Sequence, residues 1–165
     1  MPCQRLDLGC VITKRPPLSD FTLRSLRIFR VNKAVVSEFF LRSALSASYL
    51  SACADRFGFW GAPGEQGVAW GNWQHFIDYV AVLNWFVPAS FHSALGWAAT
   101  VAEVVIAVGL LLGWKLREFA TASGILLFLF ALTMTLANGF KPPLDYSVWT
   151  ASAASFFLAY SLDTP

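Results

Sequence analysis

The sequence carries few charged residues. Only 13% of its 165 residues are Asp, Glu, Lys or Arg, whereas 56% are hydrophobic. A soluble domain usually carries about 25% charged residues, so this composition excludes an ordinary water-exposed surface and predicts an integral membrane protein in contact with the lipid bilayer. The formal net charge of +2 is too small to indicate a nucleic acid partner.

Cysteine and histidine are also scarce. Cys3, Cys10 and Cys53 form no Cys-x-x-Cys pair, and His75 and His92 lie far apart in the sequence. This spacing fits none of the common zinc patterns, so we expect no metal site and no disulfide exchange by the chain itself. The sequence also lacks paired haem ligands and a glycine-rich nucleotide loop. Nothing in it therefore indicates a catalytic activity of the chain on its own.

Apolar segments dominate the rest of the chain. Four of them lie beyond residue 33, at 34–56, 91–113, 119–139 and 146–162. A membrane-spanning helix needs about 20 mostly apolar residues, which the second and third segments meet comfortably and the first and fourth marginally. Lipid tolerates only helices and closed barrels, and these segments lack the alternation of barrel strands. We therefore predict an all-α fold, a bundle of four transmembrane helices that forms one domain over residues 34–162.

The basic residues predict an orientation for this bundle. Residues 1–33 hold seven Lys and Arg residues but no apolar core of a signal peptide, so we expect a basic, disordered cytoplasmic tail. Lys115 and Arg117 follow the second segment, whereas the other two connections contain only Arg56 and Lys141. Because Lys and Arg concentrate on the cytoplasmic side, both termini are expected in the cytoplasm.

The first external connection is long and rich in tryptophan. Within it, Trp73, Phe76 and Val80 recur at helical spacing, and Pro88 follows. This pattern predicts an amphipathic helix over residues 72–86 that ends before the proline. Tryptophan prefers the headgroup level of a bilayer, so the helix is expected to lie in the membrane interface.

One acidic residue interrupts the second apolar segment. Glu103 lies in "ATVAEVVIAVGLLLG" (99–113), where small neighbours indicate that it faces another helix. Arg42 in the first segment lies at a similar depth, since it is about eight residues and Glu103 about ten residues from the cytoplasmic side at about 1.5 Å per residue. We predict a contact between Arg42 and Glu103, completed by Tyr49. Two meanings stay open: an ion pair that fixes helix register, or a polar site for a proton, a quinone headgroup or another small ligand.

A second polar group is expected at the outer surface. Asp55, Arg56, Asn138 and Asp145 all lie near the outer ends of the predicted helices. With the long connection above them, they would rim the mouth of a cavity. Asp145 also directly precedes the fourth segment, where a carboxylate caps a helix and favours its positive end.

Four stretches of this sequence resemble the DoxX family of small four-helix membrane proteins. They are "FFLRSALSASYLSA" (39–52), "ADRFGFWG" (54–61), "AEVVIAVGLLLGWKLR" (102–117) and "KPPLDYSV" (141–148), and the resemblance covers about residues 36–160. It implies a four-helix bundle in the plasma membrane of a prokaryote, associated with sulfur or quinone redox systems. On the motif positions it points to Arg42, Asp55, Arg56, Glu103 and Asp145 without giving them roles.

The function expected from these features is that of an accessory subunit in a membrane redox system. Such a subunit would contact other subunits of the complex, or a second copy of itself, and would offer a small apolar pocket with quinone as the candidate ligand. Two alternatives stay open. One is a small proton-coupled transporter that uses Glu103, and the other is a purely structural membrane scaffold. An apolar pocket favours the first function, a water-filled path favours transport, and a sealed ion pair favours the scaffold.

Overall fold

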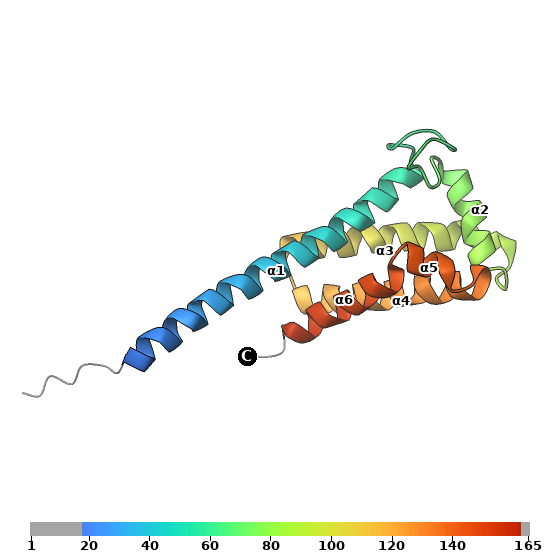
Figure 1. Cartoon of the computed structure of the whole chain (residues 1–165). Coiled ribbons are helices and arrows are strands. Elements are labelled where there is room, and N and C mark those ends of the chain that lie inside the picture. The colour runs from blue at the N-terminus through green and yellow to red at the C-terminus, as the bar shows by residue number, and fades with distance from the viewer. Residues whose placement is uncertain (1–17, 163–165) are drawn as a thin grey trace, which may run out of the picture. The chain divides into compact units, whose positions relative to one another are not determined.

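The computed structural model describes residues 18–162, with side chains from residue 33 onward, and this part of the chain is helical without a strand (Figure 1). The all-α prediction is therefore confirmed for these residues. The elements are α1 (Leu18–Arg56), α2 (Trp73–Leu83), the short 3-10 helix η1 (Ala89–Phe91), α3 (His92–Leu112), α4 (Leu116–Asn138), α5 (Lys141–Asp145) and α6 (Val148–Ser161).

The chain divides into two units, residues 1–36 and residues 37–165. The described part of the first unit belongs to α1, which begins at Leu18 directly after Pro16 and Pro17. Residues 18–33 are thus helical, whereas we expected a disordered tail up to residue 33. No glycine or proline lies between Leu18 and Arg56, so nothing in this stretch breaks a helix. The rest of the expected tail, residues 1–17, lies outside the described residues.

Among the described residues, two helices are long and apolar enough to cross a membrane, Ala89–Leu112 and Leu116–Asn138. They correspond to the predicted segments 91–113 and 119–139. The 21 residues of α3 and the 23 of α4 extend over about 32 and 35 Å, which matches a hydrocarbon core of about 30 Å. Gly113, Trp114 and Lys115 form the tight connection between them, and Lys115 has a positive φ of 42°.

The fourth predicted segment forms a shorter helix than expected. Helix α6 begins at Val148, after Ser147 with a φ of 56°, and contains 14 residues. The five residues of α5 precede it. The single helix expected over 146–162 is therefore shorter than predicted, at about 21 Å. Both α5 and α6 pack on α4, and the α4–α6 contact is the more extensive one.

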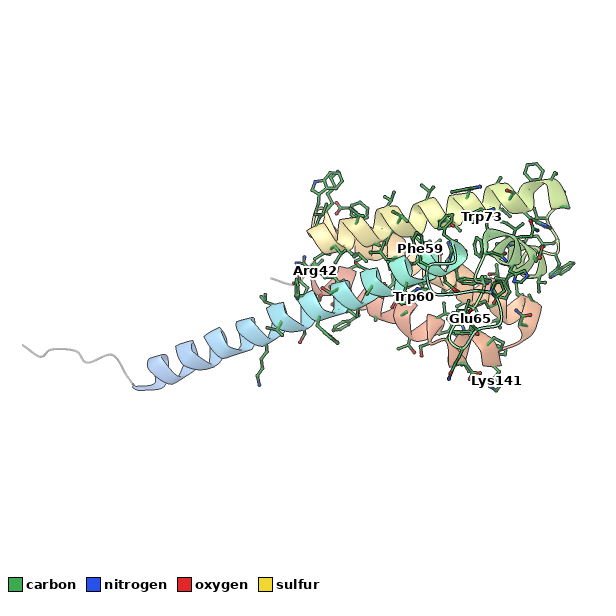
Figure 2. All side chains as sticks on the ribbon, turned by 90° about the horizontal axis from the view of Figure 1, so that it is seen from above. Arg42, Phe59, Trp60, Glu65, Trp73 and Lys141 are labelled. Carbon is green, nitrogen blue, oxygen red and sulfur yellow. The ribbon has the colours of Figure 1, made fainter. Side chains whose placement is uncertain are left out.

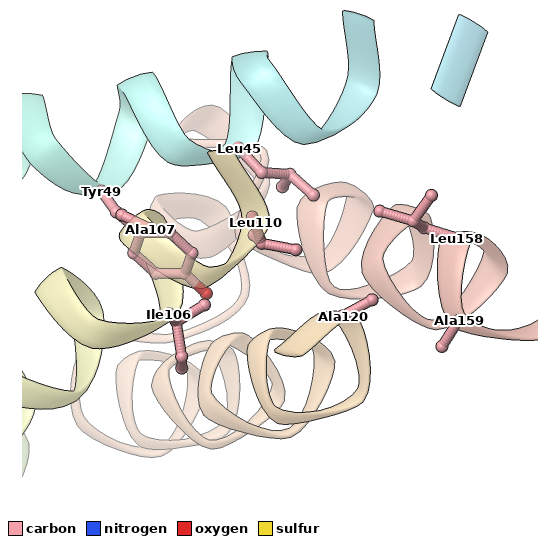
Figure 3. Close-up of a cluster of buried hydrophobic side chains, with 8 residues drawn as sticks. All are labelled: Leu45, Tyr49, Ile106, Ala107, Leu110, Ala120, Leu158 and Ala159. Atoms are coloured by element: carbon pink, nitrogen blue, oxygen red, sulfur yellow. The ribbon is translucent and has the colours of Figure 1, made fainter. Parts of the chain in front are cut away.

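A cluster of buried side chains lies where α1, α3, α4 and α6 meet (Figure 3). Most of its members are small or aliphatic, which lets the helices approach closely. Its residues are Leu45, Tyr49, Ile106, Ala107, Leu110, Ala120, Leu158 and Ala159.

Helix α2 lies across the start of α3, at one end of the second unit (Figure 1). It covers Trp73–Leu83, within the predicted range 72–86, and the side chain of Asn72 caps it by accepting from the amide of His75 at 2.9 Å. Its buried residues are Phe76 and Val80. Gly96 of α3 permits this packing, because a Cβ there would lie 2.5 Å from the Ile77 side chain.

Candidate functional site

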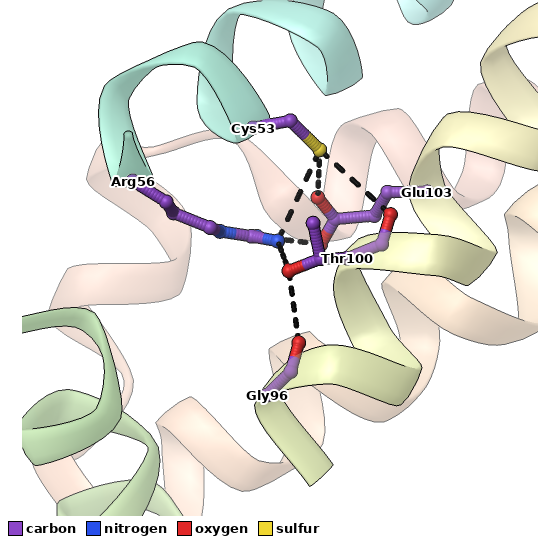
Figure 4. A network of polar contacts seen from close by, with 5 residues as sticks. All are labelled: Cys53, Arg56, Gly96, Thr100 and Glu103. Atoms are coloured by element: carbon purple, nitrogen blue, oxygen red, sulfur yellow. Dashed lines mark hydrogen bonds and ion pairs between the residues drawn. The ribbon is translucent and has the colours of Figure 1, made fainter. Parts of the chain in front are cut away.

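A buried ion pair joins α1 to α3 (Figure 4). The Arg56 guanidinium donates from Nη2 to Glu103 Oε1 at 2.7 Å and from Nη1 to Thr100 Oγ1 at 2.7 Å. The thiol of Cys53 donates to Glu103 Oε2 at 3.3 Å. Both carboxylate oxygens of Glu103 are therefore hydrogen-bonded, which a buried charge requires.

Helical spacing brings these side chains together. On α1, Cys53 and Arg56 are three residues apart and share one face. On α3, Thr100 and Glu103 have the same spacing, and the Thr100 hydroxyl donates to the carbonyl of Gly96 at 2.8 Å. Because the Thr100 hydroxyl hydrogen is used in this bond, a lone pair of its oxygen is free to accept from Arg56. The Gly96 carbonyl thus orients Thr100, and Thr100 orients Arg56.

Aromatic rings close the network on the side of α2. The Arg56 Cζ atom lies 4.0 Å from the centroid of the Phe76 ring and 5.4 Å from that of Trp70. Arginine over an aromatic face is attracted by the ring quadrupole. Arg56 is only 3% exposed and Glu103 only 1%, so the ion pair is almost completely enclosed by protein.

The partner of Glu103 is thus Arg56. The depth estimate from the sequence predicts Arg42 instead, and this prediction is wrong. Arg42 instead packs at the end of α3, where its Nη1 lies 2.5 Å from the position that a Cβ on Gly113 would occupy. Ser46 Oγ donates to the carbonyl of Ala107 at 3.0 Å, which fixes the antiparallel register of α1 and α3. Each turn onward from Arg42 along α1 therefore meets an earlier turn of α3. The depth estimate placed residue 34 level with the end of α3, whereas Arg42 lies there. The predicted register of α1 against α3 was therefore wrong.

Tyr49 belongs to a neighbouring network that ties in two further helices. Its hydroxyl lies 2.9 Å from Ser123 Oγ on α4, and Ser123 Oγ lies 2.9 Å from Ser155 Oγ on α6. Ser152 of α6 also donates to the carbonyl of Gly124 at 2.9 Å. Interhelical hydrogen bonds between small polar side chains commonly join helices within membranes. The predicted residue Tyr49 is therefore buried on the same face of α1 as Arg56, but it bonds to serine and not to the ion pair.

The outer polar group is only partly brought together. Asp55, Arg56 and Asn138 line one cleft, whereas Asp145 forms an exposed ion pair with Lys141 on α5. Asp145 does not cap the following helix, because α6 begins after Ser147 and no side chain caps it. Three of the four residues thus line one cleft, the rim of a cavity mouth stays a prediction, and the capping role of Asp145 is wrong.

Asp55 fastens the long connection to the end of α1. Its Oδ2 accepts from the backbone amides of Ala69 and Trp70 at 2.9 and 3.0 Å. Near this point Trp60 donates through its indole nitrogen to the carbonyl of Ser51 at 3.0 Å. Figure 2 shows Phe59 and Trp60 in this connection, with Arg42 further back along α1.

The cleft beside the ion pair has a volume of about 1890 Å³ and is partly open. Residues of all six α-helices in the described part of the chain line it together with part of the connection 57–72, and most of them are apolar. Ligand pockets commonly measure about 300–1,000 Å³, so this cleft has room for a molecule with a long apolar body. Burial raises the pKa of the lining phenol Tyr79, and Tyr146 adds to this shift, so Tyr79 presents a neutral hydroxyl.

No protein-family model, curated protein or solved structure matches this chain. The resemblance to the DoxX family therefore stays a prediction that rests on the sequence motifs alone. Among the described residues, no group of three His, Cys, Asp or Glu side chains is placed to hold a metal ion.

Several residues of the site were not predicted from the sequence. Thr100, Phe76 and Trp70 surround Arg56, and Ser123 and Ser155 continue the network from Tyr49. One signal for Thr100 was present, since it lies three residues before Glu103 and thus on the same helix face. Ser123 and Ser155 are polar residues in uncharged apolar segments, and this was the only signal in the sequence that pointed to them.

Proposed function

We propose that the chain is a four-helix membrane protein of DoxX type in a prokaryotic plasma membrane, with both termini in the cytoplasm. Support comes from the two helices that are long and apolar enough to cross a bilayer. An apolar stripe also covers the outside of α3, with exposed residues Val101, Val105, Val108 and Leu112. So much exposed apolar surface is unusual in a soluble protein. In the proposal, lipid covers this stripe, and α1 and the α5–α6 pair supply the remaining two crossings.

The outer membrane surface lies at α2 in this arrangement. Several aromatic side chains around it are exposed, among them Phe59, Trp60, Trp85 and Phe86. Aromatic residues with an amphipathic ring are typical of the headgroup level. Helix α2 and the connection 57–72 then rest in the interface, while Lys115 and Arg117 lie on the cytoplasmic side.

Cysteine labelling tests this topology. We expect a Gln66→Cys variant to react with a membrane-impermeant maleimide in intact cells, and a Glu118→Cys variant to react only after permeabilisation. Both positions are exposed. Cys3 and Cys10 are replaced by serine in both variants, whereas Cys53 is buried and stays. Labelling of Glu118→Cys but not of Gln66→Cys in intact cells would reverse the orientation.

The proposed function is the binding of a small, mostly apolar molecule such as a quinone, within an accessory subunit of a quinone- or sulfur-linked redox system. One observation carries this proposal: the apolar cleft of about 1890 Å³ includes Glu103 and Arg56 in its lining. An apolar pocket with a few convergent polar groups is the usual form of a ligand site. The partners in this proposal are the other subunits of the redox system or a second copy of the chain.

A structural scaffold is the second candidate, and the enclosure of the ion pair favours it. Arg56 is bonded to both Glu103 and Thr100 and covered by Phe76, as expected for a pair that fixes helix register. Proton-coupled transport through Glu103 has no comparable support, because this carboxylate is saturated by Arg56 and Cys53.

Photolabelling of the cleft distinguishes ligand binding from the scaffold. The probe is an alkyl benzoquinone with a diazirine on its chain, applied to the full chain in lipid nanodiscs. We expect labelling of cleft residues on α1 and α4, and a reduction of roughly tenfold in Ala98→Trp, because Ala98 lines the cleft and a bulky ring fills part of it. Val101→Trp is the matched control, since Val101 is exposed on the same helix and does not line the cleft. Equal labelling of both variants, spread over all lipid-facing positions, would favour the scaffold.

A further inference from the structure

Two buried polar atoms in the lining of the cleft have no partner. Asp55 Oδ1 and Arg56 Nε are enclosed and form no hydrogen bond with any residue that the structure describes. The residues that carry them are 5% and 3% exposed, and both line the cleft. Buried side-chain polar atoms nearly always have a hydrogen-bond partner, so each of these two atoms indicates that a polar group belongs beside it.

Neither side chain can turn to satisfy these atoms. The other oxygen of Asp55 already holds the amides of Ala69 and Trp70, and both terminal nitrogens of Arg56 already hold partners on α3. Rotation of either side chain would break these bonds. The two atoms are therefore a fixed acceptor and a fixed donor.

A fixed, unpaired acceptor discriminates between ligand groups. We infer that the cleft takes a lipid-soluble molecule that bears a hydroxyl group, a phenol, quinol or alcohol, with the hydroxyl directed to Asp55 Oδ1. A hydroxyl donates a hydrogen bond, so it supplies the proton that Asp55 Oδ1 lacks. A ketone, quinone or ether oxygen only accepts, and it leaves Asp55 Oδ1 unpaired. This inference rests on the proposed function and specifies the ligand of the same cleft.

The remaining walls suit the body of such a molecule. Leu126, Leu127, Phe130 and Met134 of α4 line the cleft, and their apolar surface favours a ring or an alkyl chain. Asp55 and Arg56 are both buried, and the rings of Phe76 and Trp70 lie over Arg56. Entry of the hydroxyl thus requires the Trp70 side chain to turn aside while the backbone amide of Trp70 stays bonded to Asp55 Oδ2. Arg42 Nε is likewise unpaired among the described residues, but it does not line the cleft and has no part in this site.

Two probes that differ only in the hydroxyl test the inference on the wild-type chain. The first, 4-pentylphenol, donates and accepts, whereas its methyl ether 4-pentylanisole only accepts. Each competes with the photoreactive benzoquinone in nanodiscs, and its concentration in the lipid is measured on empty nanodiscs. We expect the phenol to compete roughly tenfold better than the ether, as one hydrogen bond to a charged group requires. Equal competition would overturn the hydroxyl preference and leave the proposed function standing, whereas a failure of the benzoquinone itself to label the cleft would overturn both.

The variant Asp55→Asn sharpens this test. Its amide oxygen can keep accepting from Ala69 and Trp70, so that its NH₂ group takes the place of Oδ1 and turns the acceptor into a donor. We expect the preference to fall to within about twofold or to invert toward the ether. The matched control Asp78→Asn lies in the same cleft but carries an exposed side chain bonded to Gln74, and it should keep the wild-type preference. An unchanged preference in Asp55→Asn would also overturn the assignment.

Discussion

Replacing Arg56 with methionine is expected to lower the free energy of unfolding by about 3–5 kcal/mol. The change leaves the Glu103 carboxylate buried, and its remaining hydrogen-bond partner is the uncharged thiol of Cys53. It also removes the donor to Thr100 and the cation packed on Phe76. Unfolding in mixed micelles, followed by circular dichroism, measures the effect on the full chain.

The double variant Arg56→Met with Glu103→Gln separates the charge from the packing. Removing both charges takes away the unpaired carboxylate, so we expect the double variant to recover more than half of the lost stability. The exposed pair of Lys141 and Asp145 provides the control, because Lys141→Met should change stability by only about 0–1 kcal/mol. A loss in Arg56→Met no larger than in Lys141→Met would show that Glu103 does not need a cation.

The sequence was sufficient to predict which segments are apolar helices, because this depends on composition over long windows. The segments 91–113 and 119–139 correspond to α3 and α4 within a few residues. The start of α1 and the break before α6 were not predictable in this way. Leu18–Lys33 contains charged residues but no glycine or proline that would end a helix. Ser147 adopts a left-handed backbone conformation, which a serine in the sequence does not predict.

Several residues of the candidate site could be predicted from the sequence, but their hydrogen-bond and ion-pair partners could not. Glu103, Arg56, Asp55 and Tyr49 were all singled out, since polar groups in apolar segments need partners. Which partner each one finds depends on the axial register of α1 against α3, and that register is set by contacts such as Ser46 with Ala107. A shift of two helical turns changes every pair, and hydropathy alone does not determine such a shift.

Substituting Gly71 with alanine is expected to open the connection 57–72. Gly71 has a φ of 69°, and a Cβ there would lie 2.5 Å from the backbone nitrogen of Pro63 and 2.8 Å from the carbonyl carbon of Ala62. The left-handed conformation costs about 1–2 kcal/mol for a residue with a Cβ, and overpacking against backbone adds about 1–3 kcal/mol. The closed connection would thus lose about 2–5 kcal/mol, which corresponds to a roughly 30-fold or larger shift toward an open form.

Hydrogen exchange at two amides reports this opening directly. The N–H groups of Ala69 and Trp70 are held by Asp55, so we expect their exchange in Gly71→Ala to accelerate by the same roughly 30-fold factor or more. Gly67→Ala is the matched control, because Gly67 also has a positive φ of 86° but has nothing within 4 Å of an added Cβ. It should show only the conformational part, about 1–2 kcal/mol. Equal exchange in the two variants would mean that the approach of Gly71 to Pro63 does not hold the connection closed, and that Asp55 keeps its partners without it.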